Sequence, residues 1–523
     1  MSPTSSPQPS INGESEDAPD SDLTRTESMR SAADRFSPIH ELVFVLVVCM
    51  AQFMTQAALG ACLAPLAIIG DGLNISQPGI LSWLIAGYSL TVGTFILFFG
   101  RLGDLFGYRL MFIIGFLWFA LWSMVAGVSV YSNYILFIFA RTLQGLGPAM
   151  LLPNGLAILG ATYRPGRKKH MVFSLFGAMA PNGSVIAAII AAVFAQLAWW
   201  PWIWWSMALW CFLLAILGIY AIPPTPTPAR IRTLSARELC SEMDLLGATL
   251  GITGLVLVNI AWNQAPVVGW SQPYVYSLLL VGLLILAGFL TWETRFARHP
   301  LIPFHALTPD VSFILACVAC GWASFGIWIY YFWRFLEDIR GISPIVASVQ
   351  FLPPAITGII AAFSTGHLLS KLHPGWIMVI AMAAFTLGNV LSAITPVHQT
   401  YWALSFVTLL IIPFGMDMSF PAATVVLSDA VGKEHQGVAA SLVCTIVNYS
   451  ISLGLGFAGT VEVHVNHGAE TFHDTLVGYR GAFYMGIGLG GLGLVTSLVY
   501  VVHAVGRGKQ RERREVKEGT GDA

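Results

Sequence analysis

Two charged side chains lie inside long apolar stretches of this sequence, where a charge is costly and therefore points to function. Arg141 begins the run Arg-Thr-Leu-Gln-Gly-Leu-Gly, and Asp417 lies between Pro413 and Pro421. An arginine at the centre of a membrane helix costs at least about 2.5 kcal/mol to insert. Because burial favours the neutral form of a carboxyl group, Asp417 is a candidate for binding and releasing a proton.

Each of these residues also has a purely structural interpretation. Arg141 can bond backbone carbonyls, and Asp417 can cap a helix that its neighbouring prolines interrupt. Counted along their helices, the two residues differ by about 12 Å in depth. This difference predicts substrate or water rather than a permanent salt bridge between them.

The elements that carry these residues are fourteen apolar stretches. Of 523 residues, 56% are apolar and only 10% are charged, whereas about 25% are charged in a soluble protein. A bilayer core of about 30 Å requires roughly 20 residues of helix. The stretches that meet this length cover 41–67, 80–99, 110–128, 134–160, 171–197, 202–222, 245–262, 273–292, 311–333, 344–364, 375–395, 402–428, 438–459 and 481–504.

Positive charge is distributed unevenly over the connecting loops. If the N-terminus is cytosolic, most of the 26 Lys and Arg residues fall in cytosolic segments, as the positive-inside rule requires. The sequence therefore predicts a multi-pass membrane protein with both termini in the cytosol. We expect it in the plasma membrane, with the vacuolar membrane as the alternative.

Two parts of the chain repeat each other weakly. Gly100-Arg-Leu-Gly-Asp aligns with Gly366-His-Leu-Leu-Ser, and the helices around Arg141 and Asp417 align in step. Parallel repeats are typical of transporters whose two halves rock about a central site. The predicted all-α fold has 6+2+6 helices, divided into a disordered cytosolic tail (1–40), an N-terminal half (41–222), a cytosolic loop with two inserted helices (223–310), a C-terminal half (311–505) and a cytosolic tail (506–523).

The loop between the second and third stretches holds the most specific motif, which begins at Gly100 and reads Gly-Arg-Leu-Gly-Asp-Leu-Phe-Gly-Tyr-Arg. Glycines allow close backbone approach, and an acid beside arginines can form charge-assisted hydrogen bonds. The run resembles motif A of the major facilitator superfamily, G-x-L-x-D-x-x-G-x-[RK]. This resemblance implies that Gly100, Asp104, Gly107 and Arg109 form a gating loop; the alternative is an ordinary basic turn.

Two further segments resemble motifs of the same family. The run that begins at Arg141 looks like motif B, R-x-x-Q-G-x-G, which makes Arg141 and Gln144 candidate transport and coupling residues together with Asp417. The resemblance also implies that the helices of Arg141 and Asp417 both line a central cavity, so that the two residues face one pore. The run that begins at Gly177 resembles the antiporter motif C in degenerate form, with alanine before Pro181 where the motif has glycine. Pro181 is expected to kink its helix, either for antiport or for packing alone.

Fourteen helices with these motifs resemble the fungal 14-spanner drug:proton antiporters over about residues 40–505. Runs such as Thr55-Gln-Ala-Ala-Leu-Gly are similar to the aminotriazole-resistance transporter group, whose members export toxic compounds or borate, or move ammonium. One departure is the first helix, which has no acid beyond Glu41 where many 14-spanners carry an aspartate. The resemblance implies proton-coupled efflux of small toxic or drug-like molecules, such as a fungal secondary metabolite, by alternating access.

Other functions remain as alternatives. One is a facilitator or importer of a small polar species such as ammonium or borate; another is a membrane enzyme or receptor, although no cluster of catalytic residue types shares one depth. A net charge of −1 gives no basic excess for nucleic acid, and no G-x-x-x-x-G-K-[ST] loop is present for ATP. We expect a monomer without cofactor or metal, whose partners are the bilayer, a small substrate and protons.

Overall fold

The computed structural model describes residues 36–75, 77–163, 167–224, 235–302, 308–369, 371–430 and 436–519. Most of the predicted N-terminal tail and part of the loop at 223–310 lie outside these ranges. The described residues form helices and no strands. The elements are α2 (Pro38–Leu63), α3 (Leu66–Gly72), α4 (Pro78–Phe106), α5 (Tyr108–Val128), the 3-10 helix η2 (Ser129–Tyr131), α6 (Tyr134–Gln144), α7 (Leu146–Thr162), α8 (Arg167–Leu197), α9 (Pro201–Ala221), α10 (Ala236–Glu242), α11 (Leu245–Val268), α12 (Pro273–Arg295), α13 (Pro309–Arg334), the π-helix η5 (Phe335–Ile339), α14 (Pro344–Gln350), α15 (Leu352–Leu369), α16 (Pro374–Ile394), α17 (Leu404–Ala430), α18 (Gln436–Val465) and α19 (Phe472–Gly519).

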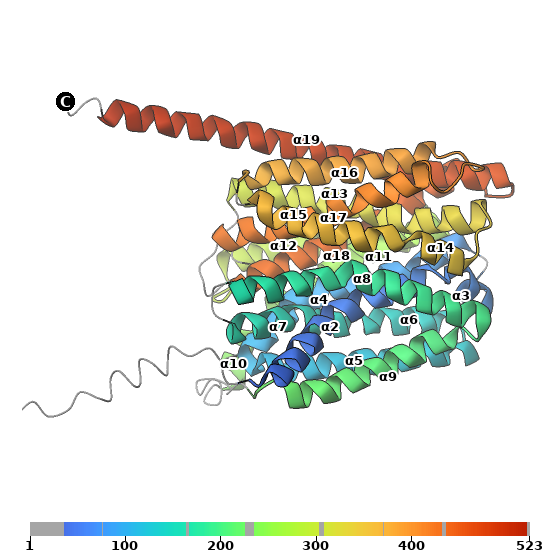
Figure 1. Ribbon diagram of the computed structural model, residues 1–523, viewed down its shortest axis with the longest axis horizontal. Coiled ribbons are helices and arrows are strands. Elements are labelled where there is room, and N and C mark those ends of the chain that lie inside the picture. Colours follow the sequence, from blue (N-terminus) through green and yellow to red (C-terminus); the bar gives the residue numbers. More distant parts are fainter. Residues whose placement is uncertain are drawn as a thin grey trace, which may run out of the picture.

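The described residues contain 14 helical segments that are long and apolar enough to cross a membrane, which confirms the predicted fold class. The long helices run side by side along the long axis of the molecule (Figure 1). Four spans combine two elements each, namely α5 with η2, α6 with α7, α13 with η5, and α14 with α15. The beginning of α2 and the end of α19 lie at the same end of the bundle (Figure 1), as an even number of crossings requires.

Local sequence signals determine where many of these helices begin. The helices α2, α4, α9, α12, α13, α14 and α16 have proline in their first turn. Proline is well placed there because the first amides of a helix have no helical acceptor. Ser37 caps α2 by accepting from the His40 amide at 3.2 Å, and Asn133 caps α6 by accepting from the Leu136 amide at 2.9 Å.

The same helix pairs pack in the two six-helix groups. In the first group, α2 packs on α8, α4 packs on α7, and α5 packs on both α7 and α9. In the second group, α13 packs on α18, α15 packs on α17, and α16 packs on both α17 and α19. This correspondence, helix for helix, supports the repeat found in the sequence. The residue boundaries of the predicted halves stay predictions.

The two groups meet along two equivalent helix pairs, α4 with α18 and α8 with α15. Glycine allows the first pair to approach closely, since a Cβ on Gly93 would lie 2.6 Å from the Tyr449 amide nitrogen. Beside the second pair, Ser348 of α14 donates to the Ala188 carbonyl of α8 at 3.2 Å. The groups are therefore joined by backbone contacts that small side chains permit.

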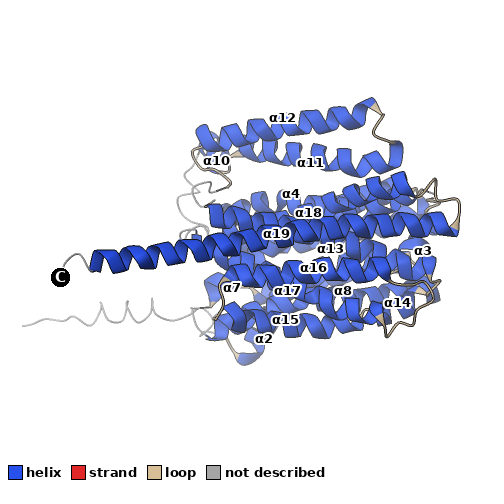
Figure 2. Ribbon diagram, turned by 90° about the horizontal axis from the view of Figure 1, so that it is seen from above, coloured by secondary structure: helices blue, strands red, loops and turns tan. Residues whose placement is uncertain are grey.

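The helices α11 and α12 lie to one side of the two groups (Figure 2). α11 packs against both α4 and α18, and α12 packs against α11. The Ser452 hydroxyl of α18 shares its one proton between the Ala86 carbonyl of α4, at 2.9 Å, and Asn259 Oδ1 of α11, at 3.0 Å. This buried network bonds α11 to both groups, whereas only 17% of the apolar stretch of α12 is buried.

Candidate functional site

A cavity of about 90 Å³ lies between the two six-helix groups. The first group contributes α2, α4 and α8, and the second contributes α13, α15, α17 and α18. Because both groups form its walls, a rocking movement between them would change its shape. The lining consists of Thr55, Gln56, Leu59, Tyr88, Ser89, Ala180, Pro181, Ser184, Val185, Trp322, Phe325, Trp328, Ile329, Phe351, Pro354, Ile412, Met416, Asp417, Val447, Asn448 and Ile451.

Asp417 provides the one carboxylate among the described residues that line this cavity. Its Oδ2 atom is buried and has no hydrogen-bond partner among the described residues, whereas its backbone carbonyl accepts from Thr365 Oγ1 at 3.3 Å. α17 continues through Pro413 and Pro421 as a single helix. The carboxyl group is thus placed on the cavity wall within a continuous helix.

Asp417 and Pro181 meet at Gly358 of α15. A Cβ on Gly358 would lie 2.7 Å from Asp417 Oδ2 and 3.2 Å from Pro181 Cγ. Only a residue without a side chain leaves room for both groups at this point. Two of the residues predicted from the sequence, one on α8 and one on α17, therefore lie beside each other across the boundary between the groups.

Sequence reasoning misses the aromatic face of α13. Trp322, Phe325 and Trp328 recur every three residues, which places them on one side of the helix, and all three line the cavity. Trp322 Nε1 donates to Ser419 Oγ at 3.1 Å, and Trp328 Nε1 donates to Ser392 Oγ at 3.0 Å. The spacing is visible in the sequence, but in a membrane helix such a face is equally consistent with contact to lipid.

Arg141 and Gln144 lie together on α6, behind the cavity wall. The Arg141 side chain is 0% exposed. Its guanidinium group donates to the Leu84 carbonyl at 3.2 Å, to the Ala58 carbonyl at 3.0 Å and to Gln144 Oε1. It also lies 4.6 Å from the ring centroid of Tyr88, which does line the cavity. Arg141 thus holds together α2, α4 and α6 one layer away from the cavity.

This arrangement differs from the expectation that Arg141 and Asp417 face one pore. Asp417 reaches the cavity, whereas the donors of Arg141 bond mainly to backbone carbonyls. The carbonyls satisfy an arginine that would otherwise be buried without partners. A role of Arg141 and Gln144 in coupling stays a prediction.

The segment predicted to form a gating loop is mostly helical: Gly100 and Asp104 lie in the last turns of α4, and Gly107 alone separates α4 from α5. Gly107 ends α4 with φ +99°, a backbone conformation that favours glycine. Arg109 donates to the Ile219 carbonyl of α9 at 2.5 Å. The Tyr108 hydroxyl donates to Asp104 Oδ1 at 2.9 Å. Arg109 therefore bonds this segment to α9 of the first group.

The same segment also contacts the second group and the inserted segment. A Cβ on Gly100 would lie 3.1 Å from Ser441 Oγ of α18. Arg101 donates from Nε to the Glu242 carbonyl of α10 at 3.1 Å and lies 3.9 Å from its carboxylate. Glu242 lies in turn 3.8 Å from His299, in the segment after α12. The segment therefore contacts both six-helix groups and the inserted segment, and a movement of any of the three would change its contacts.

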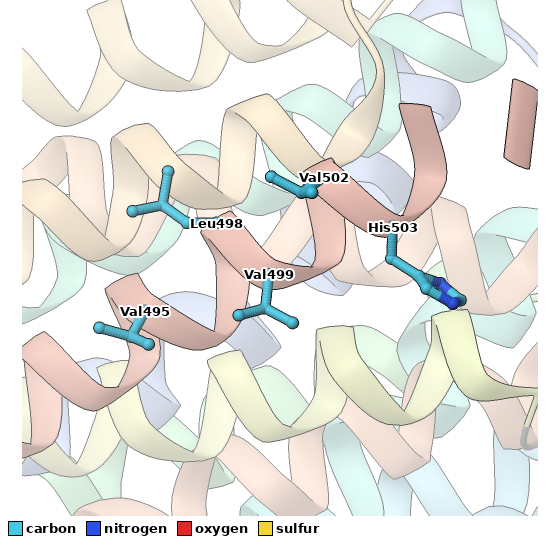
Figure 3. A pocket seen from close by; sticks show the side chains of 5 residues that line it. All are labelled: Val495, Leu498, Val499, Val502 and His503. Carbon is cyan, nitrogen blue, oxygen red and sulfur yellow. The ribbon is translucent and has the colours of Figure 1, made fainter. Parts of the chain in front are cut away.

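A second depression lies on α19 (Figure 3), and its four aliphatic lining residues are between 42% and 72% exposed. A surface of this kind is expected on a helix that faces lipid tails. Because the depression lacks the converging polar groups that fix a ligand, the central cavity is the better candidate. The depression is lined by Val495, Leu498, Val499, Val502 and His503.

The described residues offer no cluster of three His, Cys, Asp or Glu side chains that could hold a metal ion. His464, one of the histidines before the last span, uses Nδ1 in a 2.7 Å bond with the Thr460 carbonyl of its own helix. The single carboxylate of the cavity falls short of the ligand sets of zinc or magnesium. The cavity can therefore supply proton exchange, hydrogen bonds and aromatic contacts.

Comparison with known proteins identifies the family. The family described as Major Facilitator Superfamily matches residues 44–455. The chain belongs to the major facilitator superfamily. A crystal structure of the nucleoside transporter NupG (D323A mutant) shares the fold, with a TM-score of 0.55 and 12% sequence identity over 88% of this chain and 99% of that chain.

Curated members of the superfamily include several fungal relatives. The low affinity ammonium transporter of Saccharomyces cerevisiae is 54% identical over 91% of each chain. Efflux pump terJ of Aspergillus terreus is 48% identical over 88% of each chain. The aminotriazole resistance protein of Saccharomyces cerevisiae is 38% identical over 90% of this chain and 85% of its own. These relatives confirm the resemblance to the fungal efflux and aminotriazole-resistance group, and they show a multi-pass membrane transporter.

Proposed function

We propose that this protein exports small, toxic or drug-like molecules in exchange for protons by alternating access. The observation that carries the proposal is the place of Asp417: a cavity carboxylate with an unpartnered Oδ2 atom, on a wall shared by both six-helix groups. In this scheme Asp417 binds a proton on one side of the membrane and releases it when substrate arrives from the other. The efflux pump terJ is a relative consistent with this direction of transport.

Pro181 and Gly358 support this role because they place the Asp417 carboxylate against α8, the helix of the other group. Any rocking of α8 against α15 moves Pro181 relative to Asp417 and changes how much water reaches the carboxylate. The segment from Gly100 to Arg109 would act as the cytosolic gate. Arg141 and Gln144 would couple movements of α6 to the cavity through the contact of Arg141 with the Tyr88 ring. We also propose a monomer in the plasma membrane with both termini in the cytosol.

A second candidate is a facilitator or importer of ammonium. Two observations favour it: the relative at 54% identity is a low affinity ammonium transporter, and the cavity of about 90 Å³ is smaller than the roughly 300–1,000 Å³ of pockets for drug-sized ligands. The wall from α2 also carries Thr55 and Gln56 rather than an acid. The two candidates differ in whether flux depends on a proton gradient.

The experiment that separates them measures cellular accumulation of a compound panel in a host without its own exporters. The panel includes aminotriazole, borate and ammonium, each with and without a proton uncoupler. Export coupled to protons lowers accumulation, and the uncoupler restores it. Accumulation that rises, or that falls equally with the uncoupler, favours the facilitator.

Two variants locate the coupling group. Asp417→Asn should abolish the uncoupler-sensitive part of the flux while protein remains in the membrane. Asp71→Asn is the matched control, because Asp71 on α3 is exposed and does not line the cavity. Normal flux with unchanged pH dependence in Asp417→Asn would contradict the proposed role of this carboxyl group.

A further inference from the structure

Two acidic side chains outside the central cavity lie together at one end of the inserted helix pair. Asp244 is the residue before α11, and Glu293 lies in the last turn of α12. Both are buried, with Asp244 6% and Glu293 4% exposed. The beginning of α11 and the end of α12 lie close to α10 (Figure 2). The proposed function makes no use of this pair.

The two carboxyl groups converge on Gly247 in the first turn of α11. A Cβ on Gly247 would lie 2.8 Å from Asp244 Cγ and 2.7 Å from Glu293 Oε1, so that only glycine leaves room for both groups. Glu293 is near enough to Asp244 for a hydrogen bond between their side chains. Two carboxyl groups can form such a bond only when one of them is protonated, because an ionised carboxylate has acceptors and no donor.

The two oxygens of Asp244 differ in their partners. Oδ1 accepts from the Gly247 amide at 3.1 Å and from Trp292 Nε1 at 2.9 Å. Oδ2 is buried, and no donor group of the described residues reaches it. A buried acceptor without a donor is costly. A proton on Glu293 would supply the missing donor.

Neighbouring basic groups do not neutralise the pair. Arg101 and His299 lie 3.9 and 3.8 Å from the carboxylate of Glu242 instead. Two buried carboxylates at this separation would repel each other strongly, which favours one proton shared between them. The charged or titratable side chains described on the surrounding elements are Arg101 and Asp104 of α4, Glu238, Cys240 and Glu242 of α10, Arg295 of α12, and Arg298 and His299 after α12.

The ends of the two helices favour the proton on Glu293. Asp244 caps α11 with φ +42°, and the partial positive charge of a helix N-terminus stabilises a carboxylate. Glu293 lies near the C-terminus of α12, whose partial negative charge disfavours a second carboxylate. The charge therefore belongs to Asp244 and the proton to Glu293.

We propose that Asp244 and Glu293 form a proton-binding site in which the two carboxyl groups share one proton, and that this proton holds the segment after α12 in place. Glu293 accepts from the Leu301 amide at 3.3 Å and from the Ile302 amide at 3.4 Å. These bonds are longer than the two that hold Asp244. Repulsion after loss of the proton would therefore displace Glu293 and the segment bonded to it.

The site goes beyond the proposed function, because it is separate from the cavity of Asp417. It lies at the end of the molecule that we propose to be cytosolic. His299 of the same segment lies 3.8 Å from Glu242 of α10, whose carbonyl accepts from Arg101 at 3.1 Å. The segment after α12 is thus connected through α10 to the segment that begins at Gly100, and its position should respond to pH.

The test follows hydrogen exchange of the Leu301 and Ile302 amides in the purified full-length protein, from about pH 5 to about pH 9. Exchange is read by mass spectrometry of the peptides that contain these amides and is corrected for its intrinsic pH dependence. Protection should fall about tenfold or more as the shared proton is lost, as the loss of one hydrogen bond implies. Glu470→Gln, which changes an exposed acid between α18 and α19, should leave this profile unchanged.

Variants separate a shared proton from ordinary packing. The amide of Glu293→Gln can donate to Asp244 at every pH, so that protection should stay high and lose its pH dependence. Asp244→Asn, which can donate to an ionised Glu293, gives the same test if the first variant does not fold. Glu293→Leu should lower protection at every pH, because the acceptors are gone. His299→Gln should keep the pH profile of the unmodified protein.

Thermal stability gives a second measurement of the same proton. An acid in the unfolded chain releases its proton at about pH 4, whereas the folded pair retains one. The unfolded state then binds fewer protons, so that stability falls as the pH rises until the folded pair loses its proton. The melting temperature of the unmodified protein should therefore decrease with pH more steeply than that of Glu293→Gln.

Three results would overturn the inference. The first is protection of the Leu301 and Ile302 amides that is constant over the pH range in the unmodified protein. The second is the same pH dependence in Glu293→Gln as in the unmodified protein. The third is protection that depends on added sodium, magnesium or a chelator instead of pH, which would indicate a metal ion in place of the proton. Because none of these measurements uses transport, their outcome is independent of proton-coupled flux at Asp417.

Discussion

At the scale of single residues, the space beside Asp417 is the feature most open to a direct test. Gly358 leaves room between Asp417 Oδ2 and Pro181, where a Cβ would lie 2.7 and 3.2 Å from these groups. The neighbouring atoms belong to α8 and α17, which both pack against α15, so that they cannot withdraw freely. The conformation of the carboxylate thus depends on a residue that carries no functional group.

Gly358→Ala is expected to reduce transport about tenfold, because overpacking of this kind costs about 1–3 kcal/mol and displaces the carboxylate. Flux is measured in vesicles at matched protein amounts. Gly366→Ala on the same helix is the control, since a Cβ there meets nothing within 4 Å. Full activity of Gly358→Ala would show that Asp417 does not need its present position.

Arg141 can be tested for a structural role separately from a coupling role. Arg141→Lys removes the forked donor that serves the Leu84 and Ala58 carbonyls, and each hydrogen bond lost from a buried charged group costs about 1.5–3 kcal/mol. We expect a lower melting temperature in detergent, measured by loss of the monodisperse tagged protein on heating. If stability is kept while the pH dependence of flux shifts, Arg141 acts in coupling instead.

At the scale of elements, α11 packs against a helix of each group, α4 and α18, along the boundary between the groups. Its Asn259 Oδ1 and the Ala86 carbonyl of α4 both lie within hydrogen-bond distance of the Ser452 hydroxyl of α18 and share its one proton. Three helices from three parts of the chain therefore share one buried hydroxyl. Because buried polar groups are costly to leave unpaired, this network should resist sliding of α4 along α18.

A double-mutant cycle of Asn259→Ala and Ser452→Ala measures this coupling. Each single variant should lower thermal stability, and the double variant should lose less than the sum, with an interaction of about 0.5–3 kcal/mol. The comparison pair is Asn259→Ala with Thr291→Ala, whose hydroxyl is exposed on α12 and donates within its own helix. Additive losses in the first pair would mean that the network carries no coupling between these helices.

At the scale of the whole molecule, alternating access requires that contacts between the groups break in turn. The hydrogen bond of 3.2 Å from Ser348 of α14 to the Ala188 carbonyl of α8 crosses between them. A covalent bond at this point should therefore hold the cavity in one state. All seven cysteines are free, and Cys240 is the exposed one, which makes a suitable background simple to prepare.

Ala188→Cys combined with Ser348→Cys, in a chain with Cys240→Ser, should lose most transport on oxidation and regain it on reduction. The control pair is Thr91→Cys with Thr142→Cys, which joins α4 to α6 inside one group at a hydrogen bond of 2.5 Å. Oxidation of the control pair should leave transport largely intact. Continued transport by the cross-linked first pair would argue against rocking at this contact.

The sequence predicts the fold well because span length and apolarity are properties of the chain in one dimension. It predicts the site only in part, because the direction of a side chain depends on helix rotation. Asp417 and Arg141 both lie on helices close to the cavity, yet only Asp417 reaches it, since carbonyls of α2 and α4 satisfy Arg141. The contact of Asp417 and Pro181 with Gly358 results from tertiary packing, and no local sequence pattern predicts it.

The marginal position of α12 has a consequence for how this sequence can change over generations. Among the described residues its main neighbour is α11, and only 17% of its apolar stretch is buried inside the protein. Natural selection then acts on its residues mainly through their apolarity, so that one aliphatic residue can replace another with little effect. We expect α12 to accumulate substitutions faster than α11, whose Asn259 and Asn263 side chains hydrogen-bond to Ser452 of α18.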